Sequence, residues 1–325
     1  MKFLVIGYGS IGKRHTDNLK NILKNKGDII VCRKPGQKKV AGLKTFFNLK
    51  NAFAENPLAA IIATPPSLHI PIALKCAKRG LHLFIEKPLS NNLKGLDQLV
   101  KLSKKYKLTC MIGCNLRFHP GLTKLKNLIE KNSIGKIISV LSQAGQYLPD
   151  WRKETKYQNT YSAKKSFGGG VVLDLIHELD YLYWFFGKAK KVFCFADKSS
   201  TLNIDTEDNA DILLKFKNNI QANLHLDYIQ RCPQRSCQII GEKGTIIWDY
   251  YKNSLRLYIP KKGWRNLIFK NFDRNDMYVD EMKHFIECIK NKQNPLIDLK
   301  QGIEVLKIAL VAKESSEKTK VIKLD

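Results

Sequence analysis

The sequence lacks any run of about 18 or more consecutive apolar residues, the length that a membrane-spanning helix requires. Met1-Lys2 is followed at once by the strand-like run Phe3-Leu4-Val5-Ile6, which leaves no room for a secretory signal peptide. We therefore expect a cytoplasmic protein with no membrane partner.

Cysteine pairs of diagnostic spacing are also missing. The 8 cysteines are scattered, and neither Cys110/Cys114 nor Cys232/Cys237 has a C-x-x-C or zinc-ligand spacing. We expect reduced, mostly buried thiols, with no metal site and no disulfide framework.

Acidic residues are scarce: 29 Asp and Glu stand against 56 Lys and Arg, a net charge of +27. Such an excess of basic residues is typical of proteins that bind nucleic acids, because a clustered basic face binds phosphates. The lysines, however, recur along nearly every predicted surface helix and turn, so we favour a compositional drift and expect no nucleic-acid partner. A positive field would still favour an anionic substrate.

What the sequence does have is enough chain for two cores, with 325 residues of which 44% are hydrophobic. Short apolar runs alternate with helical patterns from residue 1 to about 118, which predicts a parallel sheet with helical crossovers. The expected strands are Phe3–Ile6, Ile29–Cys32, Ala59–Ala63, Leu81–Ile85 and Leu108–Ile112.

The rhythm changes after Pro120, where longer, hairpin-like β stretches follow one helix over Leu122–Glu130. We expect a second domain over 119–325 with an antiparallel sheet. Helices near Val279–Ile289 and Gly302–Ala312 close it, with packing back on the first domain as one arrangement open to them. The expected strands are Lys136–Gln146, Asp211–Phe216, Ile220–Tyr228, Cys237–Gly241 and Gly244–Tyr250.

A glycine-rich loop opens the chain. Gly7-Tyr8-Gly9-Ser10-Ile11-Gly12 follows a strand and precedes a helix, the context in which G-x-G-x-x-G binds a dinucleotide. The first glycine permits the tight turn, the second lets the backbone approach the pyrophosphate, and the third allows close strand–helix packing. The pyrophosphate then lies at a helix N-terminus.

Two cations follow the second strand, where an acidic residue would bind the ribose of NAD. Arg33 and Lys34 suit a 2′-phosphate, which favours NADP; alternatively Arg33 packs over the adenine and NAD is used. Further along, Thr64 and Pro65 end a strand where a nicotinamide ribose would lie, and His69 opens the next helix as a cofactor contact or a surface residue.

Glu86-Lys87-Pro88 follows another apolar strand. Ligands of a doubly wound sheet bind outside the carboxyl ends of its strands, so Lys87 is expected to face the cofactor and to donate a proton there. The alternative is a solvated strand-to-helix turn.

A second polar group lies in a very apolar stretch after Gly168-Gly169-Gly170. We expect one buried helix over 171–186, with Asp174, His177, Glu178 and Tyr181 along one stripe facing a cavity. His177 would act as a general acid or base, with Asp174 orienting it, unless the two form a satisfied core hydrogen bond.

These motifs together resemble the Gfo/Idh/MocA family, which includes glucose–fructose oxidoreductase and inositol dehydrogenase, and the resemblance covers essentially the whole chain. It implies the fold class α/β: an N-terminal Rossmann doubly wound parallel sheet plus a C-terminal α+β domain with a large open, mainly antiparallel sheet. It implies hydride exchange between a nicotinamide and a sugar or cyclitol carbon, with Lys87, Asp174 and His177 as catalytic residues. Glu86 and Asn115 join the predicted cofactor contacts.

One departure from the family pattern is that Asp174 and His177 stand three positions apart, where four is usual; both spacings keep the two residues on one helix face. A subgroup resemblance around 145–165 suggests an acidic or nucleotide-linked sugar of surface-polysaccharide metabolism, although such residues are also common at interfaces. The predicted substrate-binding residues are Arg117, Tyr147, Trp151, Arg152, Tyr161 and Glu178.

We therefore expect an NADP-dependent, or alternatively NAD-dependent, sugar oxidoreductase that forms a homodimer or homotetramer, because an open sheet leaves one face uncovered. The alternatives are a glycosidase that uses a bound nicotinamide for transient oxidation, and a non-catalytic nucleotide-sensing regulator of similar fold. Release of a leaving group without net cofactor turnover would distinguish the glycosidase, and loss of Lys87 or His177 would have favoured the regulator.

Overall fold

The computed structural model describes residues 1–152 and 154–324. The chain divides into two compact units, one formed by Met1–Asn115 with Arg274–Ile303 and the other by Leu116–Asp273 with Glu304–Asp325. The first unit thus recruits a segment from far along the sequence. The assignment of functional domains to 1–118 and 119–325 remains a prediction.

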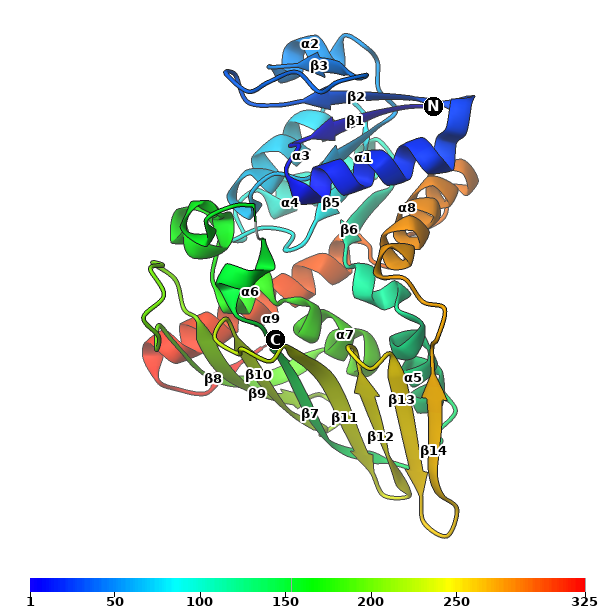
Figure 1. Ribbon diagram of the computed structural model, residues 1–325, viewed down its shortest axis with the longest axis vertical. Helices are drawn as coiled ribbons and strands as arrows, with labels where there is room; N and C mark the ends of the chain where they lie inside the picture. Colours follow the sequence, from blue (N-terminus) through cyan, green and yellow to red (C-terminus); the bar gives the residue numbers. More distant parts are fainter. Residues whose placement is uncertain (153, 325) are drawn as a thin grey trace. The chain divides into compact units, whose positions relative to one another are not determined.

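The first unit is built on a six-stranded sheet of order β3-β2-β1-β4-β5-β6 with every pair parallel (Figure 1). This order reverses at β1, the switch point at which doubly wound folds bind dinucleotides. The expected parallel sheet is confirmed, with small shifts at the strand ends. Its strands are β1 Lys2–Ile6, β2 Asp28–Cys32, β3 Lys44–Phe46, β4 Ala59–Ile62, β5 His82–Glu86 and β6 Cys110–Gly113.

Helices cover the two faces of this sheet because the crossovers run in opposite directions from β1. Helix α1, Ser10–Leu23, packs beside α8, Arg274–Asn291, while α3, His69–Ala77, packs beside α4, Leu96–Lys105. A short helix α2, Leu49–Phe53, follows β3. The central strands β1, β4 and β5 are buried apart from the first residues of β1 and β5, Lys2 and His82, as two-sided coverage requires.

The second unit carries a nine-stranded sheet of order β14-β13-β12-β11-β7-β10-β9-β8-β15. Its neighbours are antiparallel except for β10 and β7, which are parallel, so the expectation of a large, mainly antiparallel sheet is confirmed. The strands are β7 Ile137–Gly145, β8 Ala189–Asp197, β9 Asn209–Phe216, β10 Gln221–Asp227, β11 Gln234–Gly241, β12 Gly244–Asp249, β13 Ser254–Ile259, β14 Gly263–Ile268 and β15 Ile322–Lys323.

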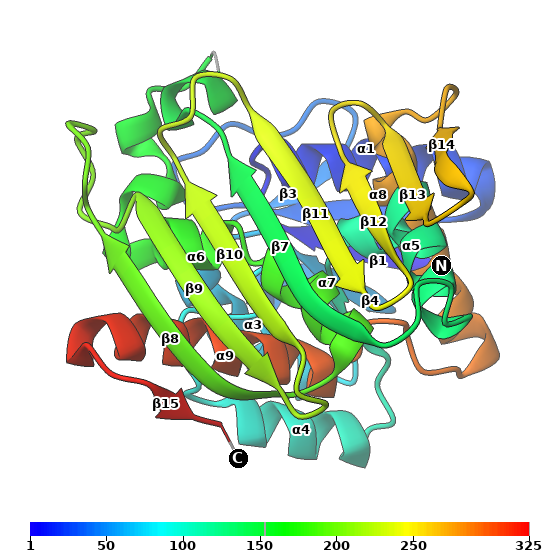
Figure 2. The ribbon, with the colours of Figure 1, turned by 90° about the horizontal axis from the view of Figure 1, so that it is seen from below.

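Helices lie behind one face of this sheet, and its other face is turned to the viewer in Figure 2. Helix α5, Pro120–Glu130, packs on β12 and β13, α6, Val171–Asp174, on β9 and β10, and α7, His177–Phe186, on β7. The last helix, α9, covers Leu299–Lys318. The face without helices exposes large apolar side chains, among them Leu141, Phe195 and Leu213.

The expected single helix over 171–186 is wrong. The structure has two short helices, α6 and α7, separated at Leu175 and Ile176. Neither residue is a proline or a glycine, so the break reflects tertiary contacts and no local sequence signal. Asp174 and His177 consequently end one helix and begin the next, and do not share one helical stripe.

The eight cysteines are free thiols, all buried except Cys232. Within residues 1–152 and 154–324, none of the helices is both long enough and apolar enough to cross a bilayer.

Candidate active site

The glycine loop between β1 and α1 has the geometry of a dinucleotide cradle. Gly7 has φ +90, and a Cβ there would lie 2.5 Å from the Ala63 carbonyl oxygen; a Cβ on Gly12 would lie 2.2 Å from the Gly7 carbonyl oxygen. Gly9 instead opens onto free space, with no atom within 4 Å of such a Cβ among the described residues. Two glycines thus allow tight packing, and the third leaves room for a ligand.

Helix α1 begins at Ser10, and its N-cap Gly9 makes no side-chain capping hydrogen bond. The first backbone N–H groups of an α-helix have no intrahelical acceptor, so they are oriented to bind an anion. The residues of this loop, including Tyr8 and Ile11, therefore fit a pyrophosphate.

The end of β2 is cationic. The guanidinium of Arg33 lies 5.6 Å from the centre of the Tyr8 ring and donates a hydrogen bond to the Lys38 carbonyl. Lys34 beside it is exposed. An arginine placed over the glycine loop can stack on adenine and bind a phosphate, and neither residue is an acid that would bind a ribose diol.

The loop after β4 is tied to the turn that carries Lys87. His69 is buried, with Nδ1 2.9 Å from the Pro88 carbonyl oxygen and Nε2 2.7 Å from that of Thr64. Burial lowers the pKa of His69 below its ordinary value, against the effect of these two carbonyls. His69 is therefore not the surface residue considered above, and it links two loops; direct contact with a cofactor remains a prediction, as it does for Pro65.

Lys87 follows β5 directly, at the carboxyl end of the parallel sheet. Its backbone N–H donates to Glu86 Oε2 at 3.2 Å, and Glu86 Oε1 lies 2.5 Å from His15 Nε2. Glu86 and His15 are both buried. Glu86, predicted as a cofactor contact, thus holds the backbone of Lys87 through a hydrogen bond.

His15 was not predicted as a site residue from the sequence. Its signal was its position three residues after Gly12, one turn inside the helix that begins at the glycine loop. Asn115, predicted as a cofactor contact, is 5% exposed and directs its Nδ2 to the Met277 sulfur at 3.8 Å.

In the second unit, Asp174 accepts hydrogen bonds from three hydroxyl groups. Tyr161 Oη lies 2.5 Å, Ser162 Oγ 2.6 Å and Tyr228 Oη 3.1 Å from its carboxylate oxygens. Burial, and then the Asp174 charge, raise the pKa of Tyr228 well above its ordinary value. These hydroxyls hold the carboxylate in one orientation, and His177 begins the next helix, 7% exposed.

Two other predicted site residues lie in buried ion pairs. Arg117, 1% exposed, donates Nε and Nη2 to the two oxygens of Asp180 at 2.9 and 2.8 Å. Arg235 Nε lies 2.9 Å from Glu178, which is fully buried. Both side chains therefore have charged partners within this unit, and direct contact of Arg117 or Glu178 with a substrate remains a prediction.

Aromatic and basic side chains adjoin the Asp174 cluster within this unit, and a further such pair lies nearby in the sequence. Trp151 meets the Tyr228 ring edge-on at 5.3 Å, and the Arg152 guanidinium lies 5.6 Å from the Tyr161 ring. Tyr147 carries the guanidinium of Arg231 over its ring at 3.5 Å. Aromatic faces and guanidinium groups suit sugar rings and anionic substituents.

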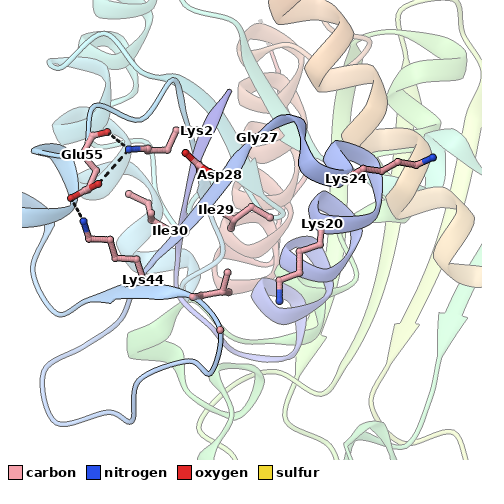
Figure 3. A pocket seen from close by; sticks show the side chains of 11 residues that line it. Lys2, Lys20, Lys24, Gly27, Asp28, Ile29, Ile30, Lys44 and Glu55 are labelled. Carbon is pink, nitrogen blue, oxygen red and sulfur yellow. Dashed lines mark hydrogen bonds and ion pairs between the residues drawn. The ribbon is translucent and has the colours of Figure 1, made fainter.

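A pocket of about 520 Å³ lies at the opposite end of the six-stranded sheet, beside the first residues of β1, β2 and β3 (Figure 3). Glu55 there accepts from both Lys2 and Lys44. Because dinucleotides bind outside the carboxyl ends of the strands, this pocket is separate from the candidate active site.

Comparison with known proteins finds two family matches. Residues 1–114 match the description "Oxidoreductase family, NAD-binding Rossmann fold", and residues 122–247 match "GFO/IDH/MocA C-terminal domain". The myo-inositol 2-dehydrogenase of Thermotoga maritima is 28% identical, with 100% of this chain and 99% of that protein covered.

Solved structures share the fold over the full length. A levoglucosan dehydrogenase in complex with NADH has a TM-score of 0.89 at 18% identity, covering 100% of this chain and 99% of its own. The WlbA dehydrogenase of Bordetella pertussis, in complex with NADH and UDP-GlcNAcA, has a TM-score of 0.85 at 20% identity with the same coverage.

Proposed function

Because the chain belongs to the Gfo/Idh/MocA family of NAD-binding oxidoreductases, we propose that it transfers a hydride between a nicotinamide dinucleotide and a hydroxyl-bearing carbon of a sugar or polyol. The observation that carries the proposal is Lys87, which follows β5 at the same edge of the sheet as the glycine loop and is supported by the buried Glu86. A lysine at this edge would place a cationic group next to a reacting hydroxyl.

The glycine loop fits the dinucleotide, since Gly9 leaves open space in front of an uncapped helix N-terminus. The dinucleotide, when bound, supplies the hydride acceptor or donor. Gly7, Gly9, Ser10 and Gly12 would hold its pyrophosphate, and Thr64 at the end of β4 would border its ribose.

Oxidation of a secondary alcohol requires removal of its proton as the hydride leaves. We assign that proton transfer to His177, whose imidazole is suited to acid–base chemistry near neutral pH. Lys87 would steady the developing alkoxide with its charge, and Asp174, fixed by three hydroxyls, would support the histidine electrostatically.

For the substrate, the proposal is an acidic or nucleotide-linked sugar. Trp151, Tyr161 and Tyr147 offer flat apolar faces. Arg152 offers a cation over the Tyr161 ring, and Arg231 offers one over the Tyr147 ring. The overall charge of +27 would draw an anionic molecule toward the protein. A structural neighbour in complex with UDP-GlcNAcA supports this class.

For the cofactor, the proposal is a preference for NADP over NAD, since Arg33 and Lys34 follow β2 where NAD-binding sites carry an acid. Arg33→Ala should then weaken NADPH binding by about 1.5–3 kcal/mol, the range for hydrogen bonds to charged groups, and leave NADH binding nearly unchanged. Fluorescence titration with both dinucleotides measures this. Tighter NADH binding in the parent protein, unaltered by the substitution, would overturn the preference.

The reaction itself is tested with a panel of polyols, uronic acids and nucleotide sugars, each incubated with the protein and NADP⁺ or NAD⁺. We expect reduced nicotinamide to accumulate, measured by absorbance, with at least one member of the panel. Release of a leaving group with no net change in nicotinamide absorbance would point instead to glycosidase chemistry.

A further inference from the structure

We infer that His15 is a positioning residue that couples binding at the glycine loop to the placement of Lys87, through the buried Glu86 carboxylate. This inference rests on the proposed function, because it assumes that a dinucleotide binds the loop and that Lys87 is catalytic. The contacts that carry it all lie within the first unit.

The coupling starts on α1. His15 belongs to the helix whose N-terminus would receive the pyrophosphate, and it is fully buried. Its ring packs edge-on with those of Phe84 and Tyr278, at distances between ring centres of 5.0 and 6.2 Å. These two packed rings leave its imidazole little freedom to turn. Any displacement of α1 therefore moves the His15 ring with it.

The His15 ring contacts a single carboxylate. Nε2 lies 2.5 Å from Glu86 Oε1, while Nδ1 is buried with no hydrogen-bond partner among the described residues. The tautomer with its proton on Nε2 leaves only an acceptor unsatisfied, so Nε2–H donates to the carboxylate. This bond is a direct polar link between helix α1 and strand β5.

Glu86 uses its two oxygens in two directions. Oε1 accepts from His15, and Oε2 accepts from the backbone N–H of Lys87 at 3.2 Å. Glu86 is only 6% exposed, so few water molecules can replace these hydrogen bonds. A shift of His15 is thereby passed to the residue that bears the reacting amine.

A second histidine holds the far side of the same turn. His69 contacts the Pro88 carbonyl, one residue after Lys87, and the Thr64 carbonyl at the end of β4. The Lys87 turn is thus held between two buried histidines, His15 of helix α1 and His69 at the start of helix α3. The His15–Glu86 contact joins helix α1 itself to this turn, whereas His69 joins the turn to the end of β4. Substitution of His15 therefore tests the link from the pyrophosphate-binding helix and leaves the His69 contacts in place.

The experiment uses hydrogen–deuterium exchange of the full chain with and without ADP-ribose or its 2′-phosphate, probes that occupy the loop but have no nicotinamide to touch Lys87. In the parent protein we expect slower exchange in peptides covering residues 4–12 and 85–92. In His15→Phe, which keeps a ring and loses the donor, the first peptide should still slow and the second should not. His15→Gln, which restores an N–H donor, should recover the second effect.

Two further variants complete the design. His82→Gln alters a histidine at the opposite end of the same strand, where it accepts from the Thr109 N–H, and should behave as the parent does. If His15→Phe does not fold, His15→Met replaces it, with a flexible apolar side chain of similar volume.

Each outcome decides between the two claims. The coupling is overturned if the probe slows exchange of residues 85–92 in His15→Phe as much as in the parent. It is also overturned if the probe slows residues 4–12 of the parent but not residues 85–92. Either result leaves the proposed function intact. If no probe or dinucleotide slows residues 4–12, nucleotide binding fails, and the coupling falls with it. With a substrate in hand, His15→Phe should lower kcat by up to about 10²-fold and leave the dinucleotide KM unchanged.

Discussion

His225 lies between two carboxylates on the open face of the nine-stranded sheet. Nδ1 is 2.8 Å from Asp211 and Nε2 is 3.4 Å from Asp227. Hydrogen bonding, first to Asp227 and then to Asp211, raises the pKa of His225 from 6.5 to about 9. The Asp227 contact is longer, but that carboxylate is fully buried, so little solvent screens it.

A raised pKa in the folded state means that protonation of His225 stabilises the fold. This contribution should be fully present below pH 6.5 and disappear as the pH rises through about 9. We therefore expect the stability advantage of the parent over His225→Gln to shrink across that interval. Urea unfolding of both proteins at several pH values measures the difference, and an advantage that stays constant or grows with pH would contradict it.

At the scale of elements, the loop between β1 and α1 contains one glycine that allows close packing, Gly12, and one that leaves space for a ligand, Gly9. Gly12 packs against the Gly7 carbonyl, so Gly12→Ala should lower the free energy of unfolding by about 1–3 kcal/mol, as overpacking does. Gly9 faces open space, so Gly9→Ala should change stability by no more than about 0.5 kcal/mol.

The binding effects of the same pair should run differently. A methyl group on Gly9 would occupy the space in front of the helix N-terminus, and dinucleotide binding should weaken by about tenfold or more, ~1.4 kcal/mol. Chemical unfolding and fluorescence titration measure the two effects. Unaltered dinucleotide affinity in Gly9→Ala would show that the loop is not the pyrophosphate site.

Elements with strong local patterns were the predictable ones. The parallel strands are continuous apolar runs, so their order along the chain followed from the sequence. Strand β3, Lys44–Phe46, was missed because three residues carry no periodicity, and β14, Gly263–Ile268, because an exposed edge strand needs few apolar residues. The break between α6 and α7 depends on contacts with distant residues.

The same limit applies to the candidate site. Motif spacing pointed to the glycine loop and to Lys87, because those roles depend on position relative to a strand. It could not show that His15 contacts Glu86, 71 positions away, or that Arg117 is committed to Asp180. Pairings of this kind are fixed by the three-dimensional packing alone.

At the scale of the whole molecule, the uncovered face of the nine-stranded sheet has the exposed apolar side chains that are typical of an interaction surface. Leu213 and Leu141 flank Asn223 in adjacent strands, and they and Phe195 are about half exposed. Exposed apolar patches of this kind mark interaction surfaces, and symmetric self-association is the common solution. We propose that a second copy of the chain covers this face.

Light scattering should accordingly show a dimer or tetramer at micromolar concentration. Leu213→Glu places a charge in the middle of the apolar patch and should release monomers, whereas Lys318→Glu, on an exposed position of α9, should not. A parent protein that is monomeric under these conditions would contradict the proposal.

The central claim is that Lys87 and His177 carry the chemistry while other residues hold the dinucleotide. Its most direct test measures hydride transfer by nicotinamide absorbance and dinucleotide binding by fluorescence in Lys87→Met and His177→Asn. We predict that both variants bind the dinucleotide as the parent does and lose roughly 10²–10⁴-fold in turnover, the range for removal of a general acid or base. Turnover within a few fold of the parent in either variant would contradict the claim.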